Sequence, residues 1–364
     1  MRIAFLIHNL NSGGAERATC ALSGYFASKG HEVGILTIDG DKPFYSLDER
    51  VDLMNLNLPE IKTGSPVKRI TAVLRRFSSI RKGIRALNPD VMIGMSHVMS
   101  AYVVFSTRFS GIKAIGTERN NPYTYQNTPV MRCLRRFCSK SAEGFVFQTK
   151  RAMAFFPAGT QKKGAVIPNA VFNPLVNEMH IAGNRSKIIT AMGRLTYQKG
   201  FDVLINAFAK IAADIPEYTL VIYGKGNDKD ALERLVGEHG LAGRVLLPGT
   251  SPDAIKKVAG SSVFVLSSRL EGMPNALMEA MACGVPCIST NCPMGPEELI
   301  EDGVNGVLIP VDDVGALAES MLKILTDGDF AAKIAANAYK LRETHSIESV
   351  GELWLNYIDK IING

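Results

Sequence analysis

The amino-acid sequence predicts an α/β protein with two domains, each built on a parallel β-sheet. Its 364 residues are more natural for two domains than for one, because a domain usually takes about 100–200 residues. Short apolar runs recur along the chain, each followed by a turn and a helical pattern, which is typical of β/α/β units. With 46% hydrophobic and 21% charged residues, either half can bury a core of its own.

The predicted strands are five apolar runs in each half of the chain. In the first half they are Ile3–Ile7, Val33–Ile38, Val91–Ile93, Ala114–Gly116 and Gly144–Val146. In the second half they are Ile188–Met192, Thr219–Tyr223, Val245–Leu247, Val263–Leu266 and Pro286–Ser289. Such nearly continuous apolar runs indicate sheets that helices cover on both faces.

The domain boundary is predicted near Ile167-Pro168-Asn169-Ala170-Val171. Beyond it, Asn173-Pro174 and Gly183-Asn184 interrupt regular structure. We therefore expect one domain over residues 1–170 and a second over 171–345. Residues 346–364 have apolar side chains at helical spacing, so we expect a terminal helix that packs back toward the N-terminal domain.

The sequence indicates a cytoplasmic protein without a metal site. No stretch approaches the roughly 18 apolar residues that a membrane-spanning helix needs. The apolar opening Met1–Ile7 reaches His8 and Asn9 too early for a signal peptide. The six cysteines form no CxxC pair and have no histidine at a metal-ligand spacing, which favours reduced structural thiols.

Positive charge is concentrated in the first half, where residues 1–182 carry a net charge of +12 against −6 for the rest. Val67–Leu87 reads as a helix with seven Lys and Arg and no acids. Its expected apolar stripe consists of Ile70, Leu74, Phe77, Ile84 and Leu87. A second basic cluster, near Phe137, consists of Arg132, Arg135, Arg136 and Lys140.

These two basic segments favour docking to an anionic membrane surface. A helix packed on its sheet with a solvated cationic face is the simpler alternative. A nucleic-acid-binding protein is the non-enzyme alternative, but few aromatic residues lie among the cations and no known motif is present. We therefore expect no nucleic-acid partner.

Three segments that follow predicted strands are candidates for binding an anionic ligand. The first begins with Gly13 and Gly14, whose backbone can approach a ligand at the start of a helix. This is not the full GxGxxG pattern, and a purely structural turn is an alternative. The second contains Arg194 and Lys199, five residues apart, a pair suited to neutralising a diphosphate. A solvated basic loop is its alternative.

The third segment is Glu271-Gly272-Met273-Pro274-Asn275, which leads into a helix that contains Glu279. Gly272 frees the backbone at the start of that helix, where N–H groups can meet a phosphate. A carboxylate can hold two hydroxyl groups, which suits ribose and hexose recognition. An exposed pair of acids is the alternative for Glu271 and Glu279.

Together these motifs resemble family 4 of the retaining glycosyltransferases, which adopt the GT-B fold of two Rossmann-like β/α/β domains facing a central cleft. The likeness rests on Gly13-Gly14, on Arg194 with Lys199, and on the Glu-x7-Glu spacing of Glu271 and Glu279. It extends over nearly the whole chain. Further matching segments are Ile167-Pro168-Asn169, Tyr223-Gly224-Lys225-Gly226 and Gly295-Pro296-Glu297-Glu298.

The resemblance implies a role for each matching residue. Arg194 and Lys199 would bind the donor diphosphate and stabilise the leaving nucleotide, Glu279 would hold the ribose, and Glu271 would contact the donor hexose. His97 would lie at the reacting face of the sugar, so the catalytic set would be Glu271, His97, Arg194 and Lys199. The rest of the donor site would be Gly13, Gly14, Tyr223, Gly224, Leu247, Pro248, Gly272, Met273, Asn275 and Leu277.

The resemblance also implies the chemistry. The family uses no bound metal or other cofactor, which agrees with the lack of an Asp-x-Asp motif. A nucleotide sugar is its donor substrate. Retention would proceed by front-face attack, with the departing phosphate as the base. Glu271 as a nucleophile remains an alternative that the sequence leaves open.

Glu118, Arg119 and Asn120 are the candidate acceptor-binding residues. They follow a predicted strand at its carboxyl end, where α/β sheets bind ligands. Similar Glu-Arg-Asn segments occur in family members that extend bacterial surface polysaccharides and lipid-linked oligosaccharides. The resemblance thus implies transfer of a hexose or N-acetylhexosamine, with UDP-GalNAc as the expected donor, to an undecaprenyl-diphosphate-linked saccharide.

We expect such an enzyme to be peripheral on the inner face of the cytoplasmic membrane. A transferase of the same fold with a soluble acceptor is one alternative. A hydrolysing nucleotide-sugar epimerase, which would release free sugar and nucleotide, is another.

Overall fold

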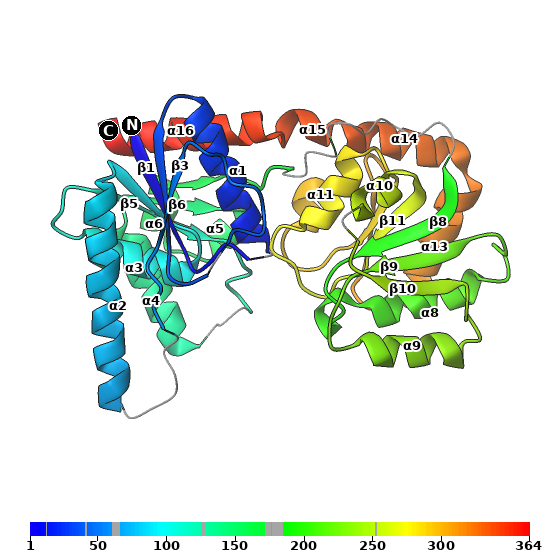
Figure 1. Cartoon of the computed structure of the whole chain (residues 1–364). Coiled ribbons are helices and arrows are strands. Elements are labelled where there is room, and N and C mark those ends of the chain that lie inside the picture. The colour runs from blue at the N-terminus through cyan, green and yellow to red at the C-terminus, as the bar shows by residue number, and fades with distance from the viewer. Residues whose placement is uncertain are drawn as a thin grey trace. The chain divides into compact units, whose positions relative to one another are not determined.

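The computed structural model describes residues 1–11, 13–40, 42–59, 66–124, 128–171, 176, 185–251 and 253–364, without the side chains of 66–70. It divides into two compact units (Figure 1), which are Met1–Phe172 together with Ile347–Gly364, and Asn173–Ser346. Each unit contains one sheet whose described strand pairs are all parallel. The predicted α/β class with two parallel sheets is confirmed. The Asn173-Pro174 and Gly183-Asn184 signals lie outside the described residues.

The sheet of the first unit has seven strands in the order β3-β2-β1-β4-β5-β6-β7. They are β1 (Arg2–Ile7), β2 (Glu32–Thr37), β3 (Val51–Asn55), β4 (Val91–Gly94), β5 (Lys113–Glu118), β6 (Gly144–Phe147) and β7 (Gly164–Val166). In register, Ile3 of β1 lies opposite Val33 of β2 and Val91 of β4. Strands β3 and β7 form the two edges, and neither was among the predicted runs.

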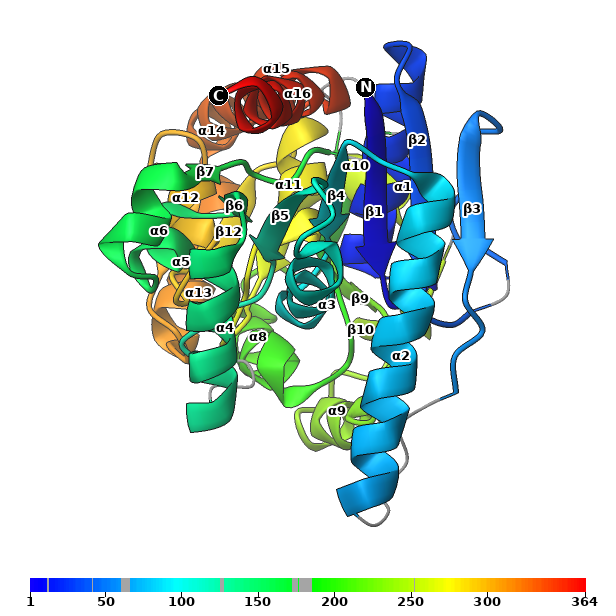
Figure 2. The same ribbon diagram turned by 90° about the vertical axis from the view of Figure 1, so that its left-hand side faces the viewer.

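Helices lie on both faces of this sheet (Figure 2). They are α1 (Gly14–Ser28), α2 (Pro66–Leu87), α3 (His97–Thr107), α4 (Pro129–Ser141), α5 (Lys150–Ala154), α6 (Ala158–Lys163) and α16 (Ile347–Asn363). The last of these is far from the others in sequence but packs against α1. Its Trp354 is 2% exposed and belongs to the core of the first unit.

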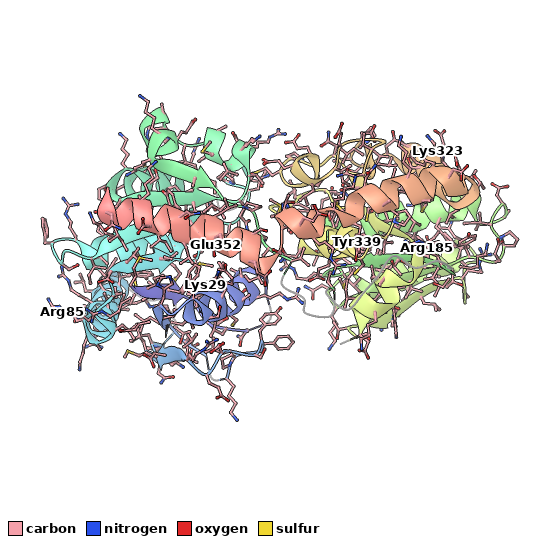
Figure 3. All side chains as sticks on the ribbon, turned by 90° about the horizontal axis from the view of Figure 1, so that it is seen from above. Lys29, Arg85, Arg185, Lys323, Tyr339 and Glu352 are labelled. Carbon is pink, nitrogen blue, oxygen red and sulfur yellow. The ribbon has the colours of Figure 1, made fainter. Side chains whose placement is uncertain are left out.

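Polar contacts also hold α16 in place. The Tyr357 hydroxyl donates to Lys163 O at 2.6 Å and accepts from Phe145 N at 2.8 Å. Burial raises the pKa of Tyr357 to about 12, so it remains a neutral donor. At the surface, Glu352 lies beside Lys29 (Figure 3), with 2.8 Å between Glu352 Oε1 and Lys29 Nζ. The terminal helix is therefore part of the first unit.

The sheet of the second unit has six strands in the order β10-β9-β8-β11-β12-β13. They are β8 (Ser186–Met192), β9 (Thr219–Tyr223), β10 (Val245–Gly249), β11 (Ser261–Leu266), β12 (Cys287–Thr290) and β13 (Val307–Ile309). The helices are η1 (Tyr197–Lys199), α8 (Phe201–Ile211), α9 (Lys229–Glu238), α10 (Ala254–Ala259), α11 (Asn275–Ala282), α12 (Pro296–Leu299), α13 (Val314–Thr326), α14 (Gly328–Tyr339) and α15 (Leu341–Thr344).

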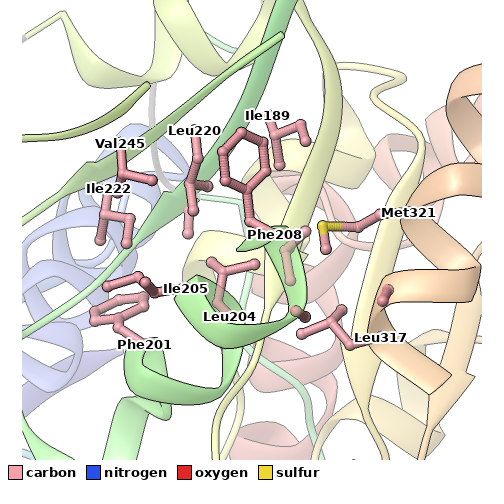
Figure 4. Packing of buried hydrophobic residues seen from close by; sticks show 14 of the residues in the cluster. Ile189, Phe201, Leu204, Ile205, Phe208, Leu220, Ile222, Val245, Leu317 and Met321 are labelled. Carbon is pink, nitrogen blue, oxygen red and sulfur yellow. The ribbon is translucent and has the colours of Figure 1, made fainter. Parts of the chain in front are cut away.

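The core of the second unit forms where α8 and α13 cover one face of the sheet (Figure 4). Leu204 and Phe208 of α8 are fully buried among side chains of β8 and β9 and of α13. Each large apolar side chain buried in this way contributes about 1.5–3 kcal/mol. Such a core fixes the strand ends and with them the loops that follow.

Helix α2 packs differently from its predicted apolar stripe. Leu74 is 61% exposed, whereas Ile80 and Ile84 are buried. Gly83 provides the close approach to the sheet, since a Cβ there would come within 2.8 Å of Leu36 Cδ1. The stripe was wrong at Leu74 because only the second half of α2 lies against the sheet. Ile70 lies outside the described side chains.

No helix among the described residues is long and apolar enough to cross a membrane.

Candidate active site

Both sheets contain a point at which the strand order reverses. In the first unit it lies between β1 and β4, and in the second between β8 and β11. In open α/β sheets the loops at such a point diverge above the carboxyl ends of the strands and leave room for a ligand. Gly13 and His97 follow β1 and β4, whereas Lys199 and Glu271 follow β8 and β11. The predicted residues thus divide between the two units and lie at the switch point of each.

Lys199 and Glu271 meet at the switch point of the second unit. Lys199 Nζ lies 2.5 Å from Glu271 Oε1, with 15% and 8% of the two side chains exposed. Ser268 Oγ donates to the same carboxylate oxygen at 2.6 Å. Glu271 Oε2 has no hydrogen-bond partner in the described part of the chain. The pair therefore presents a largely desolvated cation and one available carboxylate oxygen.

The loop that carries Lys199 is held by its backbone. Gly200 has φ +61, and a Cβ there would lie 2.1 Å from Ser267 O. Ser267 Oγ in turn donates to Lys199 O at 2.9 Å. Only glycine allows this contact between the loops after β8 and β11. The backbone thus brings the cation and the carboxylate together.

Arg269 lies between Ser268 and Glu271 and fixes this loop from the other side. Its Nη2 is 2.7 Å from Asp202 Oδ2, and its Nε is 2.7 Å from Asp312 Oδ1. Its guanidinium lies over the Tyr197 ring, 4.1 Å from the centroid. The hydrogen bonds that Arg269 donates to Asp202 raise the pKa of Arg269 further above its usual range. These contacts of Arg269 were not predicted, because their only signal in the sequence is an arginine two residues before Glu271.

Arg194 differs from Lys199 in being exposed. Its guanidinium has no hydrogen-bond or ion-pair partner among the residues that the structure describes. It follows β8 directly, and the turn below it is fixed because Leu195 N donates to Lys225 O at 2.8 Å. An exposed guanidinium and a half-buried ammonium on the same loop can bind an anion with a fork and a point charge at once.

Helix α11 begins at Asn275, and Glu279 lies on its second turn with 4% of its surface exposed. Burial and the nearby Glu279 together raise the pKa of Cys283 to about 12. The approach to α11 is tight, because a Cβ at Gly295 would lie 2.3 Å from Gly272 O. Four further predicted donor residues lie in this segment. Met273 and Leu277 are buried, and Gly272 and Asn275 are half-buried.

The loops after β9 and β10 are joined where Gly224 N donates to Gly249 O at 2.9 Å. Tyr223 is 5% exposed, and its ring packs with Val221 and Ala254. Leu247 is half-buried and Pro248 is exposed. Of the predicted donor residues in these two loops, Tyr223 therefore contributes backbone, while its ring belongs to the core.

In the first unit, His97 begins α3 directly after β4 and is 4% exposed. Its Nδ1 lies 4.0 Å from Glu118 Oε1. Glu118 is fully buried, and its Oε2 accepts from Arg135 Nε at 2.8 Å. Burial raises the pKa of Glu118 to about 6, and Arg135 opposes the shift. His97, Glu118 and Arg135 form one buried polar cluster.

The predicted acceptor residues therefore differ in what they can contact. The carboxylate of Glu118 is buried with Arg135, so it supports its neighbours instead of facing a ligand. Arg119 and Asn120 are half-buried. Arg119 Nη2 donates to Asn169 Oδ1 at 2.7 Å, and burial lowers the pKa of Arg119 to about 10. Asn169 belongs to the Ile-Pro-Asn segment, which the sequence offered only as a linker.

The N-terminal glycines are placed at the start of α1. Gly13 has extended backbone at φ −178, and Gly14 is the first helical residue. A Cβ on Gly13 would lie 2.2 Å from Glu16 Oε2. The absence of a side chain at Gly13 therefore leaves room for the Glu16 carboxylate at the start of the helix.

The second basic cluster is not uniformly solvated. Arg135 is 2% exposed, because α4 turns it toward Glu118, and its inclusion in a membrane-facing cluster was wrong. Arg132, Arg136 and Lys140 are exposed as expected. Arg85, in the last turn of α2, is also exposed (Figure 3).

An apolar surface lies beside these cations. Phe105 and Phe137, each 40% exposed, stack with 5.1 Å between ring centroids. Leu74, Phe77 and Phe105 line a cavity of about 450 Å³ together with Arg81. Aromatic and aliphatic side chains are thus exposed next to cationic ones on α2, α3 and α4.

Two family models match the chain, and between them they cover most of it. "Glycosyltransferase Family 4" matches residues 12–171, and "Glycosyl transferases group 1" matches residues 178–341. An uncharacterized glycosyltransferase of Haemophilus influenzae is 24% identical over 97% of this chain and 98% of its own. The chain is therefore a glycosyltransferase whose first half matches family 4 and whose second half matches group 1.

A second relative carries a more specific name. It is a Campylobacter jejuni protein called GalNAc-alpha-(1->4)-GalNAc-alpha-(1->3)-diNAcBac-PP-undecaprenol alpha-1,4-N-acetyl-D-galactosaminyltransferase, 25% identical over 100% of this chain and 99% of its own. Among solved structures, a sucrose-phosphate synthase of Thermosynechococcus elongatus superposes with a TM-score of 0.84 at 16% identity, covering 100% and 99% of the two chains. The fold is GT-B, as the sequence predicted.

Proposed function

We propose that this glycosyltransferase moves an N-acetylhexosamine, with retention, from a uridine diphosphate sugar to an undecaprenyl-diphosphate-linked saccharide. The observation that carries the proposal is the 2.5 Å contact between Lys199 and Glu271 at the switch point of the second unit. It joins a diphosphate-binding cation to a sugar-binding carboxylate. The name of the Campylobacter jejuni relative supports both the transfer of N-acetylgalactosamine and the lipid-linked acceptor.

In this proposal the two cations act on the donor diphosphate. Arg194 binds the phosphates with its open guanidinium, and Lys199 stabilises the negative charge that develops as the nucleotide leaves. No divalent ion is needed, because the two side chains supply the positive charge. The donor should therefore bind, and be transferred, in the presence of a chelator.

The two glutamates position the donor. Glu271 Oε1 is already bound by Lys199 and Ser268, so Oε2 is left to accept from a hydroxyl of the donor sugar. These two hydrogen bonds to Oε1 favour a binding role for Glu271 over a nucleophilic one. The base of the reaction is then the departing phosphate, which takes the acceptor proton on the face where the new bond forms. Glu279 holds the ribose.

The first unit supplies the acceptor side. His97 contacts the reacting face of the donor sugar, and Arg119 and Asn120 bind the acceptor. The exposed surface of Leu74, Phe105 and Phe137, with its neighbouring cations, is suited to the headgroup region of an anionic membrane. Binding there would make the enzyme peripheral and bring a lipid-linked acceptor to it.

Calorimetric titration with uridine diphosphate and a panel of its sugars tests the donor assignment. The metal-free protein should bind, and Arg194→Ala should lose most of the affinity, whereas Lys210→Ala, at an exposed position of α8, should not. Absence of binding to all of them by the folded protein would refute the uridine nucleotide. Flotation with phosphatidylglycerol vesicles tests the acceptor side, since failure to float would favour a soluble acceptor.

A further inference from the structure

The arginines of helix α4 lie in two different environments. Arg135 turns inward to the buried carboxylate of Glu118. Arg132 and Arg136 are exposed and four residues apart, so they lie on one face of the helix. Neither guanidinium has a hydrogen-bond or ion-pair partner within the described ranges of the chain. Two like charges at this spacing destabilise a helix unless something compensates them.

These two exposed side chains also line a cavity. The cavity has a volume of about 290 Å³ and is lined by Arg132, Arg136, Phe155, Phe156 and Pro157. Helix α4 packs here against α6, and Phe155–Pro157 form the link between α5 and α6 (Figure 2). The volume is at the small end of the range for ligand sites, so it suits one sugar-sized group.

The lining combines two chemistries. A guanidinium forks onto phosphate oxygens, and two of them can share one phosphate. Phe156 is 3% exposed and Phe155 is half-buried, so the opposite wall is apolar and weakens the screening of the arginine charges. An aromatic face also packs well against the C–H face of a pyranose ring. The cavity thus matches a ring that carries a phosphate.

The cavity also lies close to the loop of the predicted acceptor-binding residues Arg119 and Asn120. The Phe155 ring meets Tyr123 edge to face, with 5.0 Å between the centroids. Tyr123 is 44% exposed and lies three residues after Asn120, beyond the carboxyl end of β5. A group held by the cavity would therefore lie beside the loop of Arg119 and Asn120.

We propose that this cavity binds a phosphorylated sugar, with the phosphate on Arg132 and Arg136 and the ring against Phe155. Its identification as part of the acceptor rests on the proposed function, whereas the binding itself does not. The site is distinct from the donor phosphate site, whose cations are in the second unit. It also gives Arg132 and Arg136 a ligand other than the membrane surface.

Glucose 1-phosphate is the probe, titrated by calorimetry into the full chain with and without saturating uridine diphosphate. We expect saturable binding that the nucleotide does not abolish and that glucose does not reproduce. The double variant Arg132→Met with Arg136→Met should weaken it at least about tenfold, as the loss of two charge-assisted contacts implies. Lys140→Met, at an exposed position of the same helix outside the cavity, should leave it unchanged.

Several results would overturn the proposal. They are no saturable binding of glucose 1-phosphate, equal binding of glucose, or an equal loss in Lys140→Met, which would indicate only bulk charge. If the double variant keeps the sugar phosphate but loses phosphatidylglycerol vesicles, the arginines serve lipid headgroups instead. Failure of uridine diphosphate to bind would refute the proposed donor and leave the sugar-phosphate result standing.

Discussion

The ammonium group of Lys199 is a fixed charge beside a carboxylate, with 15% of its side chain exposed. A charge held in place before reaction costs no reorganisation when negative charge develops on a leaving group. We therefore expect Lys199→Met to lower turnover about 100-fold with saturating donor. Steady-state kinetics should show this in kcat. Near-normal kcat in Lys199→Met would remove this residue from the mechanism, and Lys210→Met controls for charge loss in the same unit.

Glu118 gives the first unit a pH dependence. Its pKa is raised to about 6 in the folded protein, mainly by burial, so the folded state holds this proton more tightly than the unfolded chain does. Its contribution to stability is fully present below about pH 4.5 and declines as pH rises through about 6. The total loss, reached near pH 7, is about 2 kcal/mol.

Denaturant unfolding across pH 4.5–7 should detect this loss. The wild type should lose about 2 kcal/mol of unfolding free energy relative to Glu118→Gln over this range, because glutamine has no proton to release. Parallel pH profiles of the two proteins would show that Arg135 balances the burial of Glu118 completely.

At the scale of elements, Gly200 connects the loops after β8 and β11. A Cβ at this position would lie 2.1 Å from Ser267 O, and φ is +61. Gly200→Ala should therefore destabilise the second unit by about 2 kcal/mol or more and weaken nucleotide binding through displacement of Lys199. Gly237→Ala is the matched control in α9, where a Cβ would meet nothing within 4 Å. It should be neutral or stabilising by up to about 1 kcal/mol, and equal effects would contradict the role given to Gly200.

The sequence predicted the long buried strands but not the short edge ones. Runs such as Ile3–Ile7 are apolar throughout because helices cover both faces of the sheet. Strand β3 has exposed Asp52 and Leu53, and β7 and β13 have three residues each, too short for any periodicity. Their strand character comes from neighbours in the sheet, which a local pattern does not contain.

The same limit explains what was missed at the site. The loops that carry Lys199 and Glu271 could be predicted to lie close together because each follows a strand. The direct contact between the two side chains depends on the tertiary structure and could not be predicted. On α4, no local signal distinguishes Arg135 from its neighbour Arg136. Only the orientation of the helix against β5 decides that Arg135 meets Glu118 and that Arg136 lines a cavity.

At the scale of the whole molecule, the two units differ in whether they are formed by one continuous segment of the chain. The second is continuous in sequence, whereas the first is completed by α16, more than 170 residues beyond its other elements. Trp354 of α16 is 2% exposed in the first core, and Phe208 is fully buried in the second. Truncating a buried aromatic residue to alanine costs about 3–5 kcal/mol.

This arrangement predicts that Trp354→Ala destabilises residues near the N-terminus and leaves α14 of the second unit protected. Phe208→Ala should have the opposite pattern, because its contacts are confined to the second unit. Hydrogen exchange followed by mass spectrometry measures the protection of each unit in both variants. Peptides from β1 and α1 report on the first unit, and peptides from β8 and α13 report on the second. If either variant accelerates exchange equally in both sets, the two units unfold together, and the division at residue 172 has no thermodynamic meaning.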